Sequence, residues 1–363
     1  MRPLLYTLGY LTLVFPGGAL LAPLAWVAVY GDIAPLSFLS EHDDFHRFIT
    51  RCIMIVALIG LWPLLKMNDM ASFKAIGLTL PTGNRRRVIL GLSVGLGSFA
   101  FLIIIGTSAS PLELNLRHPF AEWIGHVKNA GLAMILVSLI EEFLFRGVLF
   151  GTMRRSLNWR WAAVFTSIVF ASVHFLDAKP KNPEIAENLR LAKQTYIKAN
   201  EKLTSLKKKP GVDPDGITTT KKTATDARNN LHAAQRELIN PLVGLITLPN
   251  MIRGPADDPQ WAARFLNLIL AGLILAGLYQ NTGNLYVSMA VHGGWILGGK
   301  TAGMVTIRPN EATSLEAALW GEKEFLEGWA MTPILLAIIV WVFLYQQREH
   351  DSVPLNHDNA FIT

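Results

Sequence analysis

Cysteine and charge are both scarce in this sequence. The 363 residues contain one cysteine, Cys52, which excludes an intrachain disulfide framework and a zinc site built on cysteines. Charged residues make up only 17% of the chain, whereas 51% of it is hydrophobic. Soluble domains carry more charge than this, so the composition predicts a polytopic membrane protein embedded in a lipid bilayer.

Surplus basic charge is absent outside one segment. Residues 178–240 hold 13 Lys and Arg against 7 Asp and Glu, and this surplus of six equals the +6 net charge of the whole chain. The remainder is balanced, so the charge gives no reason to expect a nucleic-acid partner. The N-terminal apolar run is long and lacks a clear small-residue cleavage pattern, so we expect a retained first span rather than a signal peptide.

Long apolar runs recur along the chain and predict an all-α membrane protein with about eight transmembrane helices. They cover roughly residues 4–30, 48–66, 88–107, 129–150, 159–176, 263–280, 284–300 and 329–346. The first run contains Pro16 and Pro23, so we expect it to be kinked or broken. The proline-rich segment 241–261 fits a re-entrant or an interfacial piece equally well.

The charges between these runs predict an orientation in the membrane. Loops 67–87 and 151–160 are basic, whereas loops 31–51 and 303–327 are acidic. Because basic loops stay on the cytoplasmic side, both termini are predicted to be cytoplasmic. The same count places residues 178–240 on the non-cytoplasmic side.

Residues 178–240 follow a different pattern from the spans. Pro210-Gly211 and Pro214-Asp215-Gly216 separate two stretches in which apolar residues recur at alternating steps of four and three. The first stretch has Ile185, Leu189, Ala192, Tyr196, Ala199, Leu203 and Leu206, and the second has Ala224, Ala227, Leu231, Ala234 and Leu238. This pattern predicts an extramembrane, antiparallel coiled-coil hairpin, which is either a spacer or a recruiting element.

The predicted domain organisation follows from these boundaries. It comprises a first membrane part with spans 1–5 at residues 1–177, the hairpin at 178–240, a second membrane part with spans 6–8 at 241–346, and a cytoplasmic tail at 347–363.

Ionisable residues inside the apolar runs indicate a site. Glu141, Glu142 and Arg146 lie in the run 131–150, where such groups persist only if they face protein or water. Glu142 and Arg146 are four residues apart on one helical face and can pair. Glu141 points about 100° away and is left for chemistry. The alternative is one structural polar cluster between helices.

Two histidines, His174 and His292, also lie inside apolar runs. At 1.5 Å per residue, Glu142 and His174 are both about 18–21 Å from the basic turn between Arg154 and Arg160. His292 reaches a similar depth in its own span. One carboxylate and two imidazoles suit the activation of water by a general base, and Glu141, His174 and His292 could equally ligate zinc.

The order of these motifs resembles a known family. Glu141-Glu142-x-x-x-Arg146, then Phe170-x-x-x-His174, then a histidine in a later span, is similar to the CAAX-protease and bacteriocin-processing intramembrane endopeptidases. This is the family of the type II CAAX prenyl endopeptidase. The resemblance implies an all-helical membrane fold and hydrolysis of a peptide bond in a membrane-associated protein or peptide.

The resemblance also implies roles for individual residues. Glu141 would be the base for the attacking water, His174 would share that water, and His292 would help to stabilise the oxyanion. Arg146, with Glu142 and Phe170, would support the motif. One position departs from the family, whose third motif is His-x-x-x-Asn or Asp. Ile296 stands at that last position here, so one expected oxyanion donor is missing.

Three functions are compatible with these residues. The first is an intramembrane endopeptidase, for which a metal-free glutamate mechanism is slightly favoured over zinc, so that no cofactor is favoured and zinc is the alternative. The second is a non-catalytic membrane scaffold or immunity protein of the same fold. The third is a proton-coupled transporter with Glu141, His174 and His292 as a relay. The order and matching depth of the motifs favour the endopeptidase, and the 178–240 hairpin could recruit its substrate.

Overall fold

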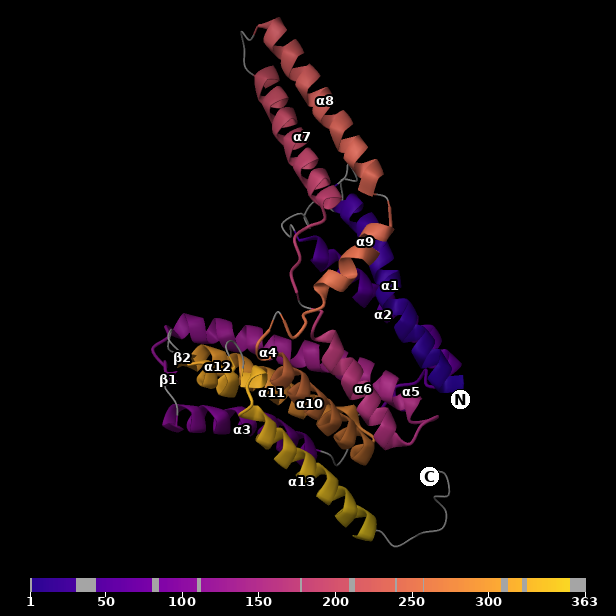
Figure 1. The fold of residues 1–363 in the computed structure, drawn as a ribbon, viewed down its shortest axis with the longest axis vertical. Helices are drawn as coiled ribbons and strands as arrows, with labels where there is room; N and C mark the ends of the chain where they lie inside the picture. Colours follow the sequence, from indigo (N-terminus) through magenta and orange to yellow (C-terminus); the bar gives the residue numbers. More distant parts are fainter. Residues whose placement is uncertain are drawn as a thin grey trace. The chain divides into compact units, whose positions relative to one another are not determined.

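The computed structural model is almost entirely helical, which confirms the predicted fold class (Figure 1). It describes residues 2–30, 44–79, 85–109, 112–176, 178–208, 213–238, 240–256, 258–307, 313–321 and 325–352. The chain forms two compact units. We call residues 1–7, 65–174 and 254–363 the core unit, and residues 8–64 and 175–253 the hairpin unit.

The core unit contains every ionisable residue singled out above. Its helices are α3 (Arg85–Ala109), α4 (Phe120–Glu142), the π-helix η2 (Phe143–Phe150), α5 (Gly151–Met153), α6 (Trp159–Val173), α10 (Trp261–Thr282), α11 (Leu285–Val305), α12 (Ser314–Trp320), η4 (Phe325–Glu327) and α13 (Met331–Ser352). Two short strands, β1 (Glu113–Leu114) and β2 (Thr306–Ile307), pair antiparallel. They tie the segment before α4 to the end of α11.

Helices α3 and α11 approach closely because glycines line their contact. Gly91 and Gly95 are four residues apart on α3, as are Gly294 and Gly298 on α11. A Cβ atom on Gly95 would lie 2.4 Å from the Val291 carbonyl oxygen and 2.9 Å from the Gly294 Cα atom. Small residues at this spacing let membrane helices pack backbone to backbone. The contact fixes the part of α11 that carries His292.

The turn between α10 and α11 is also set by local sequence. Gly283 takes a left-handed conformation, with φ of +60°, and ends α10. The Asn284 side chain then accepts a hydrogen bond of 2.8 Å from the Tyr286 amide and caps α11. Its Nδ2 atom donates to the Thr79 carbonyl at 2.9 Å. Gly283 and Asn284 thus reverse the chain and set where α11 begins.

The hairpin unit holds α1 (Arg2–Tyr30, of which the first turns belong to the core unit), α2 (Phe45–Met67), α7 (Glu184–Lys208), α8 (Pro214–Leu238), α9 (Leu242–Thr247) and the 3-10 helix η3 (Leu248–Met251). Helix α1 is continuous through Pro16 and Pro23, so the expected break does not occur. Its partner α2 supports it there, because a Cβ atom on Gly18 would lie only 2.4 Å from the Ile53 Cα atom.

The base of the hairpin packs on α1 and α2. The Trp26 ring lies tilted against Tyr30 and edge-on to Phe48, with its centroid 4.3 and 4.9 Å from theirs, respectively. Ala186 and Leu231 are fully buried in the same cluster. The hairpin is therefore anchored in an aromatic core and is not an independent appendage.

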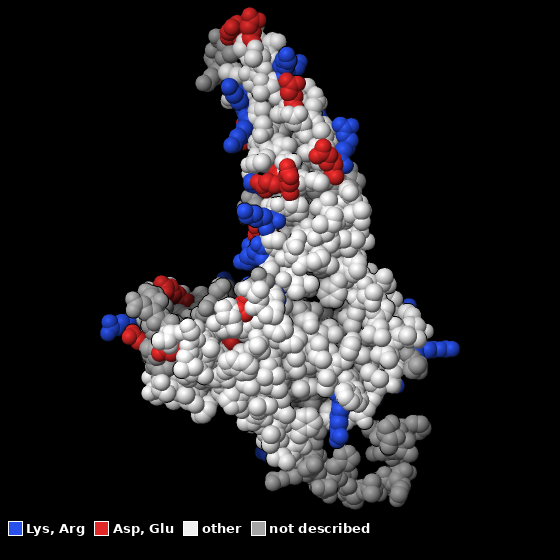
Figure 2. Space-filling view, in the orientation of Figure 1, with Lys and Arg blue, Asp and Glu red and all other residues white. Residues whose placement is uncertain are grey.

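Helices α7 and α8 lie side by side, as the heptad pattern predicts (Figure 1). The predicted seam residues with described side chains are all buried or half-buried, among them Leu189, Leu203, Ala224 and Leu231. Leu238 is helical, but its side chain lies outside the described part. Figure 2 shows Lys and Arg interspersed with Asp and Glu along the outer surface of the hairpin. The helical pairing is confirmed, whereas coiled-coil supercoiling remains a prediction.

The membrane assignment is supported by helix length and composition. Helices α1, α2, α3 and α10 are long and apolar enough to cross a bilayer. Shorter apolar helices occur at Trp159–Val173, Leu242–Met251 and Met331–Leu344. Each of the eight predicted windows overlaps a helix, but the number of eight spans remains a prediction, as does the placement of the domain boundaries. The ambiguous segment 241–261 contains the short helices α9 and η3.

Candidate active site

A change of helix type follows the two adjacent glutamates directly. Helix α4 ends at Glu142, and the chain continues as a π-helix over Phe143–Phe150 before α5 begins. Stretches of π-helix are rare and occur frequently at functional sites. The apolar pattern predicts an ordinary helix across 131–150, and no residue in it signals the change. The π-helix is therefore a feature that the sequence analysis missed.

Glu142 and Arg146 form the predicted pair, in the buried part of the site. The Arg146 Nη1 atom donates a hydrogen bond of 2.8 Å to Glu142 Oε1. The two side chains are only 0% and 3% exposed, respectively. The Arg146 guanidinium also lies over the Phe170 ring, 4.4 Å from its centroid. The pair is sealed inside protein, which is where a charged residue in an apolar helix must be.

His174 and His292 converge on Glu141. The Nε2 atom of His292 is 3.7 Å from Glu141 Oε2, and the Nε2 atom of His174 is 3.9 Å from the same oxygen. The structure thus brings together the three side chains that the sequence analysis selected. They come from the end of α4, the C-cap of α6 and the middle of α11.

The spacing of these atoms fits a bridged arrangement. Separations of 3.7 and 3.9 Å exceed the length of a direct hydrogen bond, and a water between the groups is the usual bridge at such distances. Glu141 Oε2 is buried and has no hydrogen-bond partner among the described residues. Because the Glu141 and His174 side chains are 25% and 29% exposed, the site remains reachable from outside.

Phe170 forms an aromatic wall beside the histidines. Its ring centroid lies 4.6 Å from the His174 ring and 6.1 Å from the His292 ring. Its carbonyl oxygen is 2.8 Å from the Nδ1 atom of His174. The supporting position that the sequence motif gives to Phe170 thus has a physical basis in both its ring and its backbone.

Arg264 is a residue that the sequence analysis missed. Its Nη2 atom donates to the His174 carbonyl at 3.4 Å, and its Nη1 atom lies 3.8 Å from Asp258 Oδ2. Arg264 therefore holds the end of α6, where His174 stands. The available signal was its charge in the first turn of an apolar helix.

Metal binding at this site was left open by the sequence. Glutamate and histidine are donors that zinc accepts. Over the described ranges, no group of three or more His, Cys, Asp or Glu side chains has an arrangement that could hold a metal ion.

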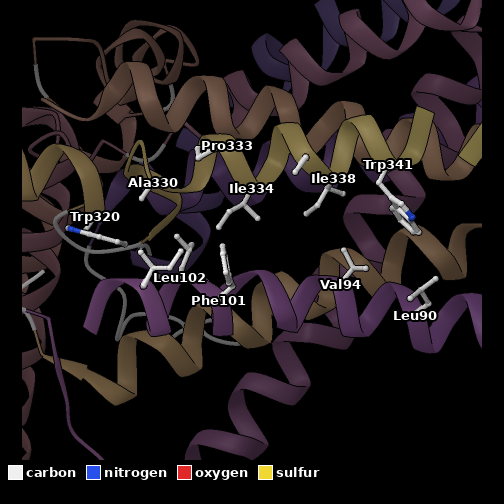
Figure 3. Close-up of a pocket in the computed structure, with 12 residues that line it drawn as sticks. Leu90, Val94, Phe101, Leu102, Trp320, Ala330, Pro333, Ile334, Ile338 and Trp341 are labelled. Carbon is white, nitrogen blue, oxygen red and sulfur yellow. The ribbon is translucent and has the colours of Figure 1, made fainter. Parts of the chain in front are cut away.

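A cavity of ≈ 680 Å³ lies between α3 and α13 (Figure 3). Its lining is apolar and includes none of the site residues described above. Its lining includes Leu90, Val94, Phe101, Trp320, Ile334 and Trp341, and none of its lining side chains is ionisable. The cavity offers no group for acid–base chemistry, so the candidate active site is the Glu141 cluster.

Comparison with known proteins gives a match over the part of the chain that holds this cluster. The family model described as "Type II CAAX prenyl endopeptidase Rce1-like" matches residues 123–195 and 232–297. The matched stretches contain Glu141, Glu142, Arg146, Phe170, His174 and His292. The unmatched residues between them, 196–231, include the distal part of the hairpin. Searches of curated proteins and of solved structures gave no match. Residues 123–195 and 232–297 of this multi-pass membrane protein are thus similar to the type II CAAX prenyl endopeptidase Rce1-like family, a family of proteases.

Proposed function

We propose that this protein is an intramembrane endopeptidase that hydrolyses a peptide bond of a membrane-associated protein or peptide. One observation carries the proposal: a partly exposed carboxylate, Glu141, lies within 3.9 Å of two imidazole nitrogens among apolar helices. A carboxylate in such a setting is suited to act as a general base towards water.

His174 is held in a form that accepts a hydrogen bond from this water. A carbonyl oxygen can only accept, so the 2.8 Å contact with the Phe170 carbonyl requires His174 Nδ1 to carry a hydrogen. In the neutral ring, Nε2 is then a bare lone pair directed at Glu141 Oε2. A water between the two groups can donate one O–H to each. This geometry supports the role of His174 in sharing the water.

The reaction then balances without a further reactant. Glu141 accepts a proton from the water, and the water oxygen attacks the peptide carbonyl carbon to form a C–O bond. The negative charge that develops on the carbonyl oxygen is stabilised by His292 once that ring carries a proton on Nε2. The C–N bond breaks as the proton reaches the leaving amine. Arg146 and Glu142 hold the helix end that presents Glu141.

The direct test is cleavage of a co-expressed candidate substrate by wild-type protein and by Glu141→Gln. We expect the variant to fold and to show no turnover. Glu122→Gln, a change of the same kind at the exposed start of α4, is the matched control and should cleave normally. Undiminished cleavage by Glu141→Gln would refute the role of Glu141.

We further propose that the hairpin presents the substrate and does not take part in the chemistry. Two observations support this. Residues 196–231 of the hairpin lie outside the family match, and the exposed residues of the hairpin include many lysines, which could attract an acidic partner or anionic headgroups. In this proposal the hairpin lies on the non-cytoplasmic side and both termini are cytoplasmic.

A further inference from the structure

Glu142 makes a second buried contact that its pairing with Arg146 does not explain. The same oxygen that accepts from Arg146, Oε1, lies 2.9 Å from the Nδ1 atom of His292. The Glu142, Arg146 and His292 side chains are all buried, so both contacts lie in the protein interior and are shielded from solvent. Glu142 thus joins the motif of α4 to the histidine of α11.

The proton between Glu142 and His292 can be assigned from these contacts. The Arg146 guanidinium is always positively charged, and at 2.8 Å it favours the ionised form of Glu142, a carboxylate that bears no hydrogen and only accepts hydrogen bonds. The hydrogen in the 2.9 Å contact must therefore belong to His292 Nδ1. In the neutral ring, Nε2 is left without a hydrogen, and it faces Glu141 Oε2 at 3.7 Å.

We propose that Glu142 is a positioning residue for His292, an inference that rests on the proposed endopeptidase function. By holding the hydrogen on Nδ1, Glu142 leaves Nε2 available to receive the proton that the water loses to Glu141. The protonated ring then donates that hydrogen to the oxyanion and finally to the leaving amine. Glu142 acts through His292 and does not touch the substrate.

The two histidines are thereby given different tasks. A carboxylate steadies a protonated imidazole by a charge-assisted hydrogen bond, whereas the neutral Phe170 carbonyl behind His174 offers less. His292 is the proton carrier and His174 remains an acceptor for the water. A protonated His292 is also a stronger donor than a neutral group, which offsets the donor missing at Ile296.

Ring protonation can be measured directly by NMR on ¹⁵N-histidine-labelled protein in nanodiscs. Spectra of His292→Gln and His174→Gln assign the two rings. In the wild type, we expect both rings to carry a hydrogen on Nδ1. An unprotonated Nδ1 on His292 would overturn the proposal, and this measurement does not depend on any activity.

A double variant separates positioning from stability. Glu142→Met with Arg146→Met removes both charges of the buried pair together, which is often close to neutral for folding. We expect a melting temperature near that of wild type, loss of the single Nδ1-protonated form at His292, and an unchanged His174 as internal control. Catalytic turnover, kcat, should fall on the order of 100- to 10,000-fold with little change in KM.

The double variant can also contradict the positioning role of Glu142. If Glu142 only partners Arg146, His292 in the folded double variant will keep its single Nδ1-protonated form, and the proposal is then wrong. A wild-type protein that cleaves no substrate but shows Nδ1-protonated His292 would instead count against the proposed function and leave the positioning contact established.

Discussion

Removing Arg146 should cost far more stability than neutralising Glu141. In Arg146→Ala, the Glu142 carboxylate, which is 0% exposed in the wild type, would lose its arginine partner and keep its contact with His292. Losing one partner of a buried ion pair typically costs about 3–5 kcal/mol. Glu141 is 25% exposed, and its Oε2 atom has no hydrogen-bond partner within the described ranges. Glu141→Gln keeps the shape of the side chain, so we expect a cost of roughly 1 kcal/mol or less.

The measurement is thermal unfolding of purified protein in detergent, followed as loss of the monodisperse species. Arg160→Ala removes an exposed arginine of the same unit and serves as control. Arg146→Ala should melt well below both Arg160→Ala and Glu141→Gln. Should Glu141→Gln be destabilised as much as Arg146→Ala, the division into a catalytic and a structural carboxylate would fail.

Three further predictions concern metal, hairpin and pH. If the mechanism is metal-free, elemental analysis of active protein should show no stoichiometric zinc; zinc that is lost together with activity in His174→Ala would reverse this preference. Replacing residues 197–230 by a short Gly/Ser linker should keep cleavage of a small peptide and sharply reduce cleavage of the native partner, whereas wild-type processing of that partner would make the distal hairpin a mere spacer. At the hairpin base, the hydrogen bonds from Arg190 hold the pKa of Glu187 below its ordinary value. The stability that this contact adds is therefore present above that ordinary value and is lost as the pH falls through the lowered pKa. Wild type should thus lose its advantage over Glu187→Gln in acid melts, and an advantage that persists in strong acid would contradict the assignment.

The linker experiment shows where the sequence was insufficient. The apolar repeat predicts the two arms, and on that basis residues 180–239 look replaceable. The structure instead buries Ala186, Leu189 and Leu231 against Trp26 and Phe45. Removing them would expose that aromatic core, so only the distal part is a clean deletion. Packing between segments more than 100 residues apart leaves no periodic signal in either one.

The candidate active site was also predictable only in part. The spacing of Glu142 and Arg146 predicts their pairing, and a rise of 1.5 Å per residue is enough to bring His174 to the depth of Glu141. Neither reasoning step could give the π-helix after Glu142, because its hydrogen bonds are chosen by the packing of buried residues such as Phe145 and Phe150. Nor could it tell which nitrogen of His292 faces which carboxylate, since that depends on the rotation of one ring.

The ends of the hairpin insertion are joined before the arms begin. The Arg253 amide donates to the Phe175 carbonyl at 2.8 Å, and the Ala178 amide donates to the Met251 carbonyl at 3.1 Å. The chain therefore leaves and re-enters the fold through one narrow stem. Once such a stem is closed, added length beyond it costs little further chain entropy. The arms can therefore be lengthened or shortened with little effect on the closure of this stem, and a foreign domain fused beyond the stem would serve as a marker for single-particle imaging.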